Sequence, residues 1–285
     1  MQKFVDWLLE RRAALIVIAV VFAPNVELIS SALIGMQWAH RGAAVAFGDA
    51  LLASLAITVV AIVAAGGLDA ALPLAMSACF AVLLGCIVGA LLRSTRSLNL
   101  ALQILLLLGF AGIVVSMMFE SAFNALFDAR VVLLVDMLRQ QQMSENEIAD
   151  LRAVLEVMQP RFIGLYGFYL CLNFVLALLL TAWLLGYARK KPDFGSDFRA
   201  VRIGHVLSVV SAAVVVLTLV LNWTLLHNLF GIATLAFLLQ GCAVLHRHGN
   251  AAGWLPLQYV PIYMIGVLFG SYVLIVGIFG EGIFV

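Results

Sequence analysis

The sequence predicts an all-α membrane protein, a polytopic transmembrane helical bundle with about seven full spans and a proline-broken N-terminal segment. Two observations support this prediction. No Lys, Arg, Asp or Glu occurs in the 43 residues from Ile203 to Leu245, whereas a helix needs only about 20 apolar residues to cross a bilayer. In addition, 65% of the chain is hydrophobic and 11% is charged, while soluble domains are about half apolar and about a quarter charged. Lipid must therefore surround much of the chain.

The first apolar segment, 13–39, contains Pro24, which removes a backbone donor and predicts a break in the helix. An alternative for its first part is a signal peptide, because basic residues precede an apolar stretch that ends in Val21-Phe22-Ala23. The charge-free run is too long for one helix, and a polar turn divides it into two spans. The seven full spans are expected at 43–65, 71–92, 98–119, 162–187, 203–222, 226–245 and 257–280.

Positive charges set the expected orientation, because cytoplasmic loops carry an excess of Lys and Arg. If every segment crosses once, at most nine of the 16 Lys and Arg residues lie inside; if 13–39 enters and returns to the same side, twelve do. We therefore expect a single integral membrane domain, 1–285, with a cytoplasmic N-terminus and an extracytoplasmic C-terminus. Its parts are N-terminal spans in 13–119, an outer connection at 120–161, and C-terminal spans in 162–285.

The outer connection contains a predicted amphipathic helix of about 13 residues. Ser144 and Glu147 fit a capping box, in which each side chain satisfies a backbone amide of the other residue. One apolar stripe follows, at Ile148, Leu151, Leu155 and Met158, and Pro160 ends the pattern. The helix is interpreted as a surface connector; the alternatives are a substrate gate and a partner-docking helix.

Polar residues recur at the predicted outer ends of the spans, and polar groups at membrane depth are candidates for function. Some share one side of a helix by their three- or four-residue spacing. We expect them to line one outward-facing pocket for a small polar or cationic ligand; the alternative is ordinary polarity at the membrane interface. The ligand-binding candidates are Glu120, Asn124, Tyr166, Tyr169, Asn173, Asn222, His227 and Glu27, with Ser116, Asp128, Asn228 and Asn25 beside them.

Asp49 is the lone acid in its predicted span, near the expected cytoplasmic end. Two roles are open, an interfacial or Arg41-paired acid and a proton-coupling acid. Two GxxxG patterns, at 85–89 and 266–270, predict close approach of helices inside the bundle or between copies of the chain.

The sequence gives little support to enzyme chemistry, because it has no GxSxG, HExxH or P-loop motif. An enzyme is therefore the less favoured interpretation, no catalytic residue is assigned, and no cofactor is expected. The four cysteines lie in apolar runs without CxxC spacing, which indicates core residues rather than disulfide or metal ligands. The net charge of +1 without a basic patch argues against nucleic-acid binding.

The run FGSDFRAVR at 194–202 resembles the cytoplasmic F-x-x-x-F-R-x-x-R element of the YybS-like family of uncharacterised bacterial membrane proteins, and QGCAVLH at 240–246 resembles its Q-G-x-A-V-x-H helix end. The resemblance covers roughly 151–263. The chain ends in EGIFV and lacks the charged tail that is common in the family. More loosely, the family is similar to the substrate-capturing S-components of energy-coupling-factor transporters.

This resemblance implies a location in the bacterial inner (cytoplasmic) membrane but no assigned activity. It suggests partner-facing roles for Phe198, Arg199 and Arg202, although the basic stretch around them also fits cytoplasmic loops that attract anionic lipid. The leading functional hypothesis is small-molecule binding or transport of the S-component type, with ligand entry from the outer face. The alternative is a non-catalytic membrane scaffold or a subunit of an envelope complex. The expected partners are the lipid bilayer, a cytoplasmic or membrane protein, and a small polar ligand.

Overall fold

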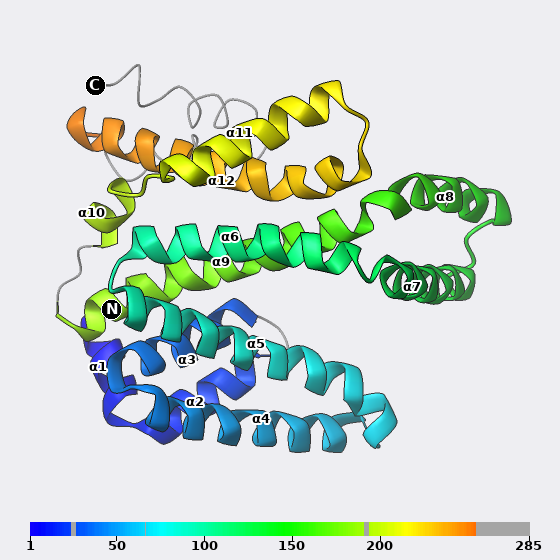
Figure 1. The fold of residues 1–285 in the computed structure, drawn as a ribbon. Helices are drawn as coiled ribbons and strands as arrows, with labels where there is room; N and C mark the ends of the chain where they lie inside the picture. Colours follow the sequence, from blue (N-terminus) through cyan, green and yellow to red (C-terminus); the bar gives the residue numbers. More distant parts are fainter. Residues whose placement is uncertain (24–26, 66, 191–193, 255–285) are drawn as a thin grey trace. The chain divides into compact units, whose positions relative to one another are not determined.

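A computed structural model describes residues 1–23, 27–65, 67–190 and 194–254 (Figure 1). Within this part of the chain every regular element is helical and no strand occurs. Five helical segments in it are long and apolar enough to cross a membrane, at Ala43–Ala64, Ala75–Thr95, Leu98–Met117, Glu145–Ala188 and Thr224–Ala251. The prediction of an all-α, multi-pass membrane protein is therefore confirmed.

The count of about seven spans stays a prediction. Helix α11 (His205–Val220), in the predicted span 203–222, has 16 residues, and at 1.5 Å per residue it is about 24 Å long. The hydrocarbon core of a bilayer is about 30 Å thick, so α11 is a shorter apolar helix. The predicted span 257–280 and the second GxxxG pattern lie outside the described residues.

The chain divides into two compact units, and the single-domain description stays a prediction. Unit 1 contains Met1–Leu105 and Leu172–Arg202, and unit 2 contains Leu106–Cys171 and Ile203–Val285. Helices α6 (Leu98–Met117) and α9 (Phe162–Ala188) each contribute one part to unit 1 and the other part to unit 2.

Among the described residues, unit 1 contains six further helices, which are α1 (Gln2–Glu10), α2 (Arg12–Phe22), α3 (Glu27–Arg41), α4 (Ala43–Ala65), α5 (Leu68–Thr95) and α10 (Phe194–Arg199). Helices α3 and α5 pack closely through small residues. A Cβ built on Gly89 of α5 would come within 2.5 Å of the Gly35 carbonyl oxygen on α3, and one on Gly85 would collide with the Ser31 carbonyl oxygen. The first GxxxG pattern therefore brings helices together inside the bundle.

Helices α2 and α3 form a broken hairpin whose two outer ends lie close together. Arg41, the last residue of α3, donates a hydrogen bond to the Leu9 carbonyl just before α2. Gly42 follows with φ of 102°, a left-handed conformation that favours glycine, and α4 begins there. The entry and return of segment 13–39 stays a prediction, and the residues around Pro24 lie outside the described part.

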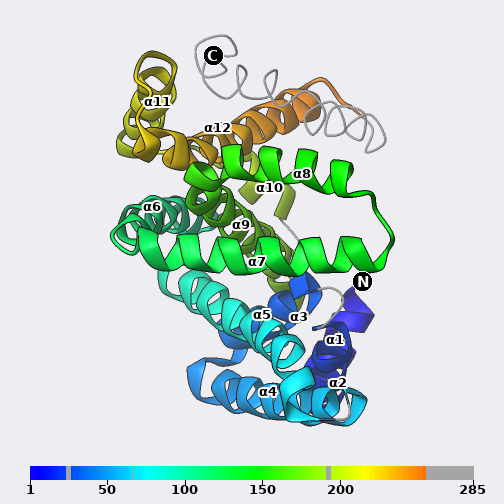
Figure 2. The same ribbon diagram turned by 90° about the vertical axis from the view of Figure 1, so that its right-hand side faces the viewer.

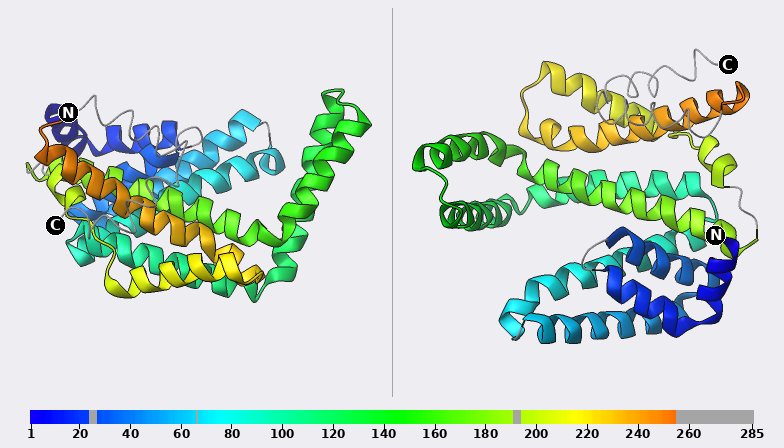
Figure 3. Two further views of the ribbon diagram at one scale, coloured as in Figure 1. Left: turned by 90° about the horizontal axis from the view of Figure 1, so that it is seen from above. Right: turned by 180° about the vertical axis from the view of Figure 1, so that it is seen from behind.

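Unit 2 contains α7 (Glu120–Gln140), α8 (Glu145–Met158), a 3₁₀ turn η1 (Gln159–Arg161), α11 and α12 (Thr224–Ala251). Helices α7 and α8 run in opposite directions (Figure 2) and turn steeply away from the α6 and α9 parts of the same unit (Figure 3). The side chains of Arg139 and Glu145 form an ion pair at 3.0 Å near the tip of this hairpin. A short turn between α11 and α12 confirms that the charge-free run is two helices.

The capping box at the start of α8 is confirmed. The Ser144 hydroxyl accepts from the Glu147 amide at 3.3 Å, and the Ser144 amide donates to the Glu147 carboxylate at 3.0 Å. The helix ends at Met158, ahead of Pro160, as expected. Of the apolar stripe, Ile148 is buried, but Met158 at the far end is exposed. The amphipathic character of α8 and its position on the membrane surface therefore stay predictions.

Candidate functional site

One end of unit 2 is held together by the amide side chain of Asn228 on α12. This residue is buried, and its Oδ1 accepts a hydrogen bond from the Gly164 amide at 2.5 Å. Its Nδ2 donates to the carbonyl oxygens of Pro160 at 3.0 Å and Thr224 at 2.9 Å. All polar atoms of the amide are therefore used to join the first turn of α12 to the junction of η1 and α9.

Glycines let α9 and α12 approach each other closely at this junction. A Cβ on Gly164 would collide with the backbone of Asn228, and one on Gly231 would come within 3.0 Å of the Phe168 Cβ. Small residues are what close helix packing in lipid requires. The junction fixes the position of the side chains around it.

Two adjoining cavities open beside this junction. One lies between α9, α11 and α12, and the other lies between the end of α8, η1 and the start of α12. The larger has a volume of about 580 Å³ and the smaller about 240 Å³. Both are lined by Arg161 and His227. The larger is further lined by Gly164, Leu165, Phe168, Thr218, Leu219, Phe230, Gly231 and Thr234. The smaller is further lined by Val157, Pro160, Asn222 and Thr224.

The two cavities differ in chemistry. Aliphatic side chains, two aromatic rings and glycine backbone dominate the larger cavity, whereas an amide and a hydroxyl face the smaller one beside the shared residues. The Arg161 guanidinium is exposed, and no hydrogen bond or ion pair engages it within the described part of the chain. The half-buried His227 ring lies 3.1 Å from the Trp223 carbonyl oxygen through Nδ1. The positive charge of Arg161 therefore lies where the smaller, polar cavity adjoins the larger, apolar cavity.

Of the predicted ligand-binding residues in unit 2, only Asn222 and His227 line these cavities. The side chains of Tyr166 and Tyr169 are 40% and 54% exposed. On α7, Glu120 is exposed and Asn124 is half-buried. None of the last four residues lines either cavity.

The other two predicted ligand residues, Glu27 and Asn173, belong to unit 1. The Glu27 carboxylate, in the first turn of α3, accepts a hydrogen bond from the Ser77 hydroxyl of α5 at 2.6 Å. Asn173 is half-buried on α9, and Asn25 lies outside the described residues. A joint pocket for all the predicted ligand residues stays a prediction.

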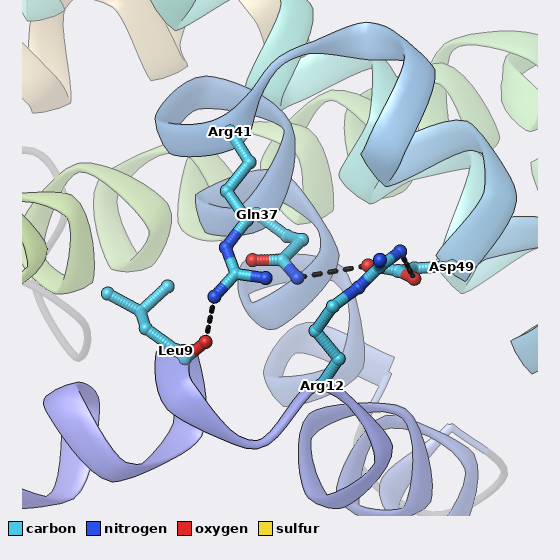
Figure 4. Close-up of polar contacts among 5 residues, drawn as sticks. All are labelled: Leu9, Arg12, Gln37, Arg41 and Asp49. Atoms are coloured by element: carbon cyan, nitrogen blue, oxygen red, sulfur yellow. Dashed lines mark hydrogen bonds and ion pairs between the residues drawn. The ribbon is translucent and has the colours of Figure 1, made fainter.

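Unit 1 contains a buried polar cluster that centres on Asp49, and Figure 4 shows its members. The Asp49 carboxylate is 1% exposed. One oxygen accepts from the Arg12 guanidinium at 2.6 Å, and the other accepts from the Gln37 amide at 2.9 Å. The sequence left two roles open for Asp49, an interfacial or Arg41-paired acid and a proton-coupling acid. The ion-pair partner is Arg12, whereas Arg41 donates to the Leu9 carbonyl, and proton coupling stays a prediction.

Sequence reasoning missed Gln37 as the second partner of Asp49. Its side chain is fully buried, and its Oε1 has no hydrogen-bond partner in the described part. The available signal was the lone acid of segment 43–65 and an amide near the end of the preceding apolar segment, with an arginine just before that segment begins. Spacing along the chain does not show that the three side chains meet, because they come from three helices.

A cavity of about 320 Å³ lies near this cluster, at the end of unit 1 where α1, α3 and α9 meet. It is lined by Asp6, Leu9, Glu10, His40, Arg41, Ala188 and Lys190. Burial, together with the positive charges of Arg41 and Arg189, lowers the pKa of His40 from its ordinary value of 6.5. The arginine and lysine therefore supply the positive charge of this cavity near neutral pH.

The predicted partner-facing residues lie in or just after α10. Phe198 is buried and stacks on Phe194 with a centroid separation of 6.0 Å, Arg199 is half-buried, and Arg202 is exposed. The backbone of Arg202 is held at both ends. Its amide donates to the Asn99 side chain, and its carbonyl accepts from the Gln103 side chain, each at 2.9 Å. A partner-facing role stays a prediction for all three.

No group of three or more His, Cys, Asp or Glu side chains that could hold a metal ion occurs among the described residues. The four cysteines are free thiols. Comparison with known families, curated proteins and solved structures finds no match to this chain. The class that the fold defines is therefore a multi-pass helical membrane protein, and the resemblance to the YybS-like family stays a prediction.

Proposed function

We propose that this multi-pass membrane protein binds a small amphiphilic acid and acts as a substrate-binding component of the S-component type in a bacterial inner membrane. The observation that supports this function is the pair of adjoining cavities that share Arg161 and His227. Small-molecule sites are usually concave, mostly apolar spaces of about 300–1,000 Å³ with a few polar groups that fix orientation. The larger cavity, about 580 Å³, has that size and lining.

The arrangement supports an anionic head and an apolar body in the ligand. A carboxylate or phosphate beside Arg161 would form charge-assisted hydrogen bonds with the guanidinium. Asn222 and Thr224 in the smaller cavity offer further polar groups for the head. An acyl or aromatic body would fill the larger cavity, where Phe168 and Phe230 form part of the wall. The sequence favoured a polar or cationic ligand, and this positive charge favours an anionic one.

The proposed orientation follows from the charge count. With the N-terminus cytoplasmic and the C-terminus outside, Arg161 and the turn between α11 and α12 lie at the outer face. The ligand then enters from outside. Any transport step would require a separate cytoplasmic ATPase, because this sequence has no P-loop.

The test uses the full chain in phosphatidylcholine nanodiscs and a dansyl-labelled undecanoic acid as the probe. We expect saturable binding, and we expect Arg161→Gln to weaken it roughly tenfold to a hundredfold, the contribution of a hydrogen bond to a charged group. Arg152→Gln is the matched control, because Arg152 is also exposed in the same connection but lines neither cavity. It should bind like the wild type.

A second probe distinguishes the contribution of the ligand's carboxylate from the contribution of its apolar body to binding. The dansyl-labelled undecanol lacks the carboxylate, so it should bind the wild type and Arg161→Gln with the same low affinity. Non-saturable partitioning of the acid, or equal losses in the Arg161 and Arg152 variants, would contradict the proposal.

The scaffold alternative is favoured by exposed apolar side chains on both helices of the α7–α8 hairpin. Val132, Leu133 and Met137 on α7 and Val154 and Val157 on α8 are all more than half exposed. Such side chains are typical of a surface that meets another protein or the membrane. If the protein forms a stable complex through this hairpin and binds neither probe, the scaffold function is the better account.

A further inference from the structure

Helix α1 has two apolar faces with different surroundings. Val5, Leu8 and Leu9 are buried against unit 1. Phe4 and Trp7, next to this buried face, are 46% and 37% exposed. Residues three or four apart share a face of a helix, so the exposed rings form one surface. A short helix with a second apolar face beside a membrane domain is typical of interfacial helices.

Hydrogen bonds fix α1 at both ends, so that its outer face is held in one position. At the start, the Gln2 side chain donates to the Tyr187 carbonyl oxygen at 2.9 Å. At the end, Arg41 donates to the Leu9 carbonyl. Arg12, just after α1, is bound to the buried Asp49. Helix α1 is therefore a docked part of the unit, and α2, with its apolar side chains, continues from it.

The acidic side chains of α1 are turned toward the protein's own cations. Asp6 and Glu10 both line the cavity that Arg41 and Lys190 also line. Asp6 in addition accepts a hydrogen bond from Gln2 at 2.9 Å. Asp6 is half-buried and Glu10 is exposed. Residues 1–12 carry three basic side chains, Lys3, Arg11 and Arg12, against these two acidic ones.

The basic residues Lys3 and Arg11 do not line that cavity. Lys3 and Arg11 are exposed and flank the aromatic pair. The rings of Phe4 and Trp7 stack with a centroid separation of 6.2 Å, and the Arg11 guanidinium lies 5.9 Å from the Trp7 ring centre. Trp collects in the headgroup layer of membranes, and basic residues there are attracted to anionic lipid.

We infer that this α1 face, made of Lys3, Phe4, Trp7 and Arg11, is a binding surface for anionic phospholipid. The rings lie among the headgroups and the two cations contact the lipid phosphates. Charge complementarity selects this partner, because the outward charges of the face are positive and its apolar part is aromatic. The inference is independent of the cavities in unit 2 and of the ligand proposed for them.

The experiment measures quenching of Trp7 fluorescence by brominated lipid. The full chain is placed in phosphatidylcholine vesicles that contain either phosphatidylglycerol or phosphatidylcholine brominated near the headgroup. The difference between the wild type and Trp7→Phe gives the share of Trp7 among the five tryptophans. Trp223→Phe is the matched control, because Trp223 is exposed at the turn between α11 and α12.

We expect Trp7 to be quenched several-fold more by brominated phosphatidylglycerol than by brominated phosphatidylcholine at equal content. The double variant Lys3→Gln/Arg11→Gln should lose this several-fold preference, and 0.5 M salt should weaken it in the wild type, because salt screens exposed charges. Trp223 should show no preference.

Two results would overturn the inference. Equal quenching of the wild type and Trp7→Phe would mean that α1 does not touch lipid. A lipid preference that survives in the Lys3/Arg11 double variant, with thermal unfolding unchanged, would mean that these cations do not select the lipid. Both results leave the binding of dansyl-labelled acid at Arg161 untouched, so the two proposals fail separately.

Discussion

The two charges of the Arg12–Asp49 pair are predicted to contribute unequally to stability. The Asp49 side chain is 1% exposed, whereas the Arg12 side chain is 49% exposed. Arg12→Met leaves a buried carboxylate with only the Gln37 amide as partner. Breaking a buried pair costs about 3–5 kcal/mol, and because Arg12 is half in solvent we expect about 2–3 kcal/mol.

Asp49→Asn should cost less, about 1 kcal/mol. The exposed half of Arg12 lets its guanidinium turn to water. The new amide keeps the side-chain volume, and a rotation of the Gln37 amide would offer it the Oε1 atom that now has no partner. In the double variant no charge is buried. Arg12→Met should therefore cost only about 0.5 kcal/mol when Asp49 is already Asn, which gives a coupling energy of about 2 kcal/mol.

The assay is reversible unfolding of the four proteins by sodium dodecyl sulfate in mixed micelles, followed by circular dichroism and evaluated as a double-mutant cycle. An Asp49→Asn variant at least as unstable as Arg12→Met would refute the reasoning, and so would additive effects of the two changes. Either result would mean that the burial of Asp49 does not determine the energetics of this pair.

Two further predictions concern unit 2. Asn228→Ala leaves a buried backbone amide of α9 without its acceptor, so it should lower the unfolding free energy by about 1–3 kcal/mol and weaken probe binding; an unchanged SDS-unfolding midpoint would contradict this. The Ser144 hydroxyl, and to a smaller extent the Ser144 amide, donate hydrogen bonds to the Glu147 carboxylate and lower its pKa from the ordinary 4.5. The ionised Glu147 carboxylate should therefore stabilise the start of α8 fully above pH 4.5. This stabilisation should be lost as the pH falls through the lowered pKa that Glu147 has in the folded protein. Hydrogen exchange of α8 amides checks this, with Glu147→Gln expected to show no such acid dependence.

The helices of the membrane-spanning part could be predicted from the sequence because hydropathy and length are local properties. The helix boundaries of the 43–65 and 98–119 segments agree with the prediction to within two residues. The capping box of α8 could also be predicted from the sequence, because Ser144 and Glu147 are only three residues apart. The same logic failed to predict the partner of Asp49, since Arg12 and Gln37 come from other helices.

The candidate site shows the same division. Residue type and hydropathy indicated polar groups at the ends of the spans, and Asn222 and His227 were among them. Arg161 was counted only among the positive charges, and Asn228 was placed with the expected pocket residues rather than at a helix junction. Their actual roles depend on how α9 and α12 cross. The close approach of these helices at Gly164 and Gly231 buries the Asn228 amide, and Arg161 lines both cavities beside this crossing.

By itself the sequence determined that this chain is a multi-pass helical membrane protein, because the cost of exposing apolar residues to water and of burying unpaired backbone groups in lipid depends only on composition and length. Tertiary structure decided which polar side chains meet. Hydrogen bonds and ion pairs act over a few ångströms, so the Asp49 cluster and the junction at Asn228 exist only where helices distant in sequence cross at small residues. The crossing geometry depends on how side chains of different helices pack together, so it cannot be predicted from any single segment.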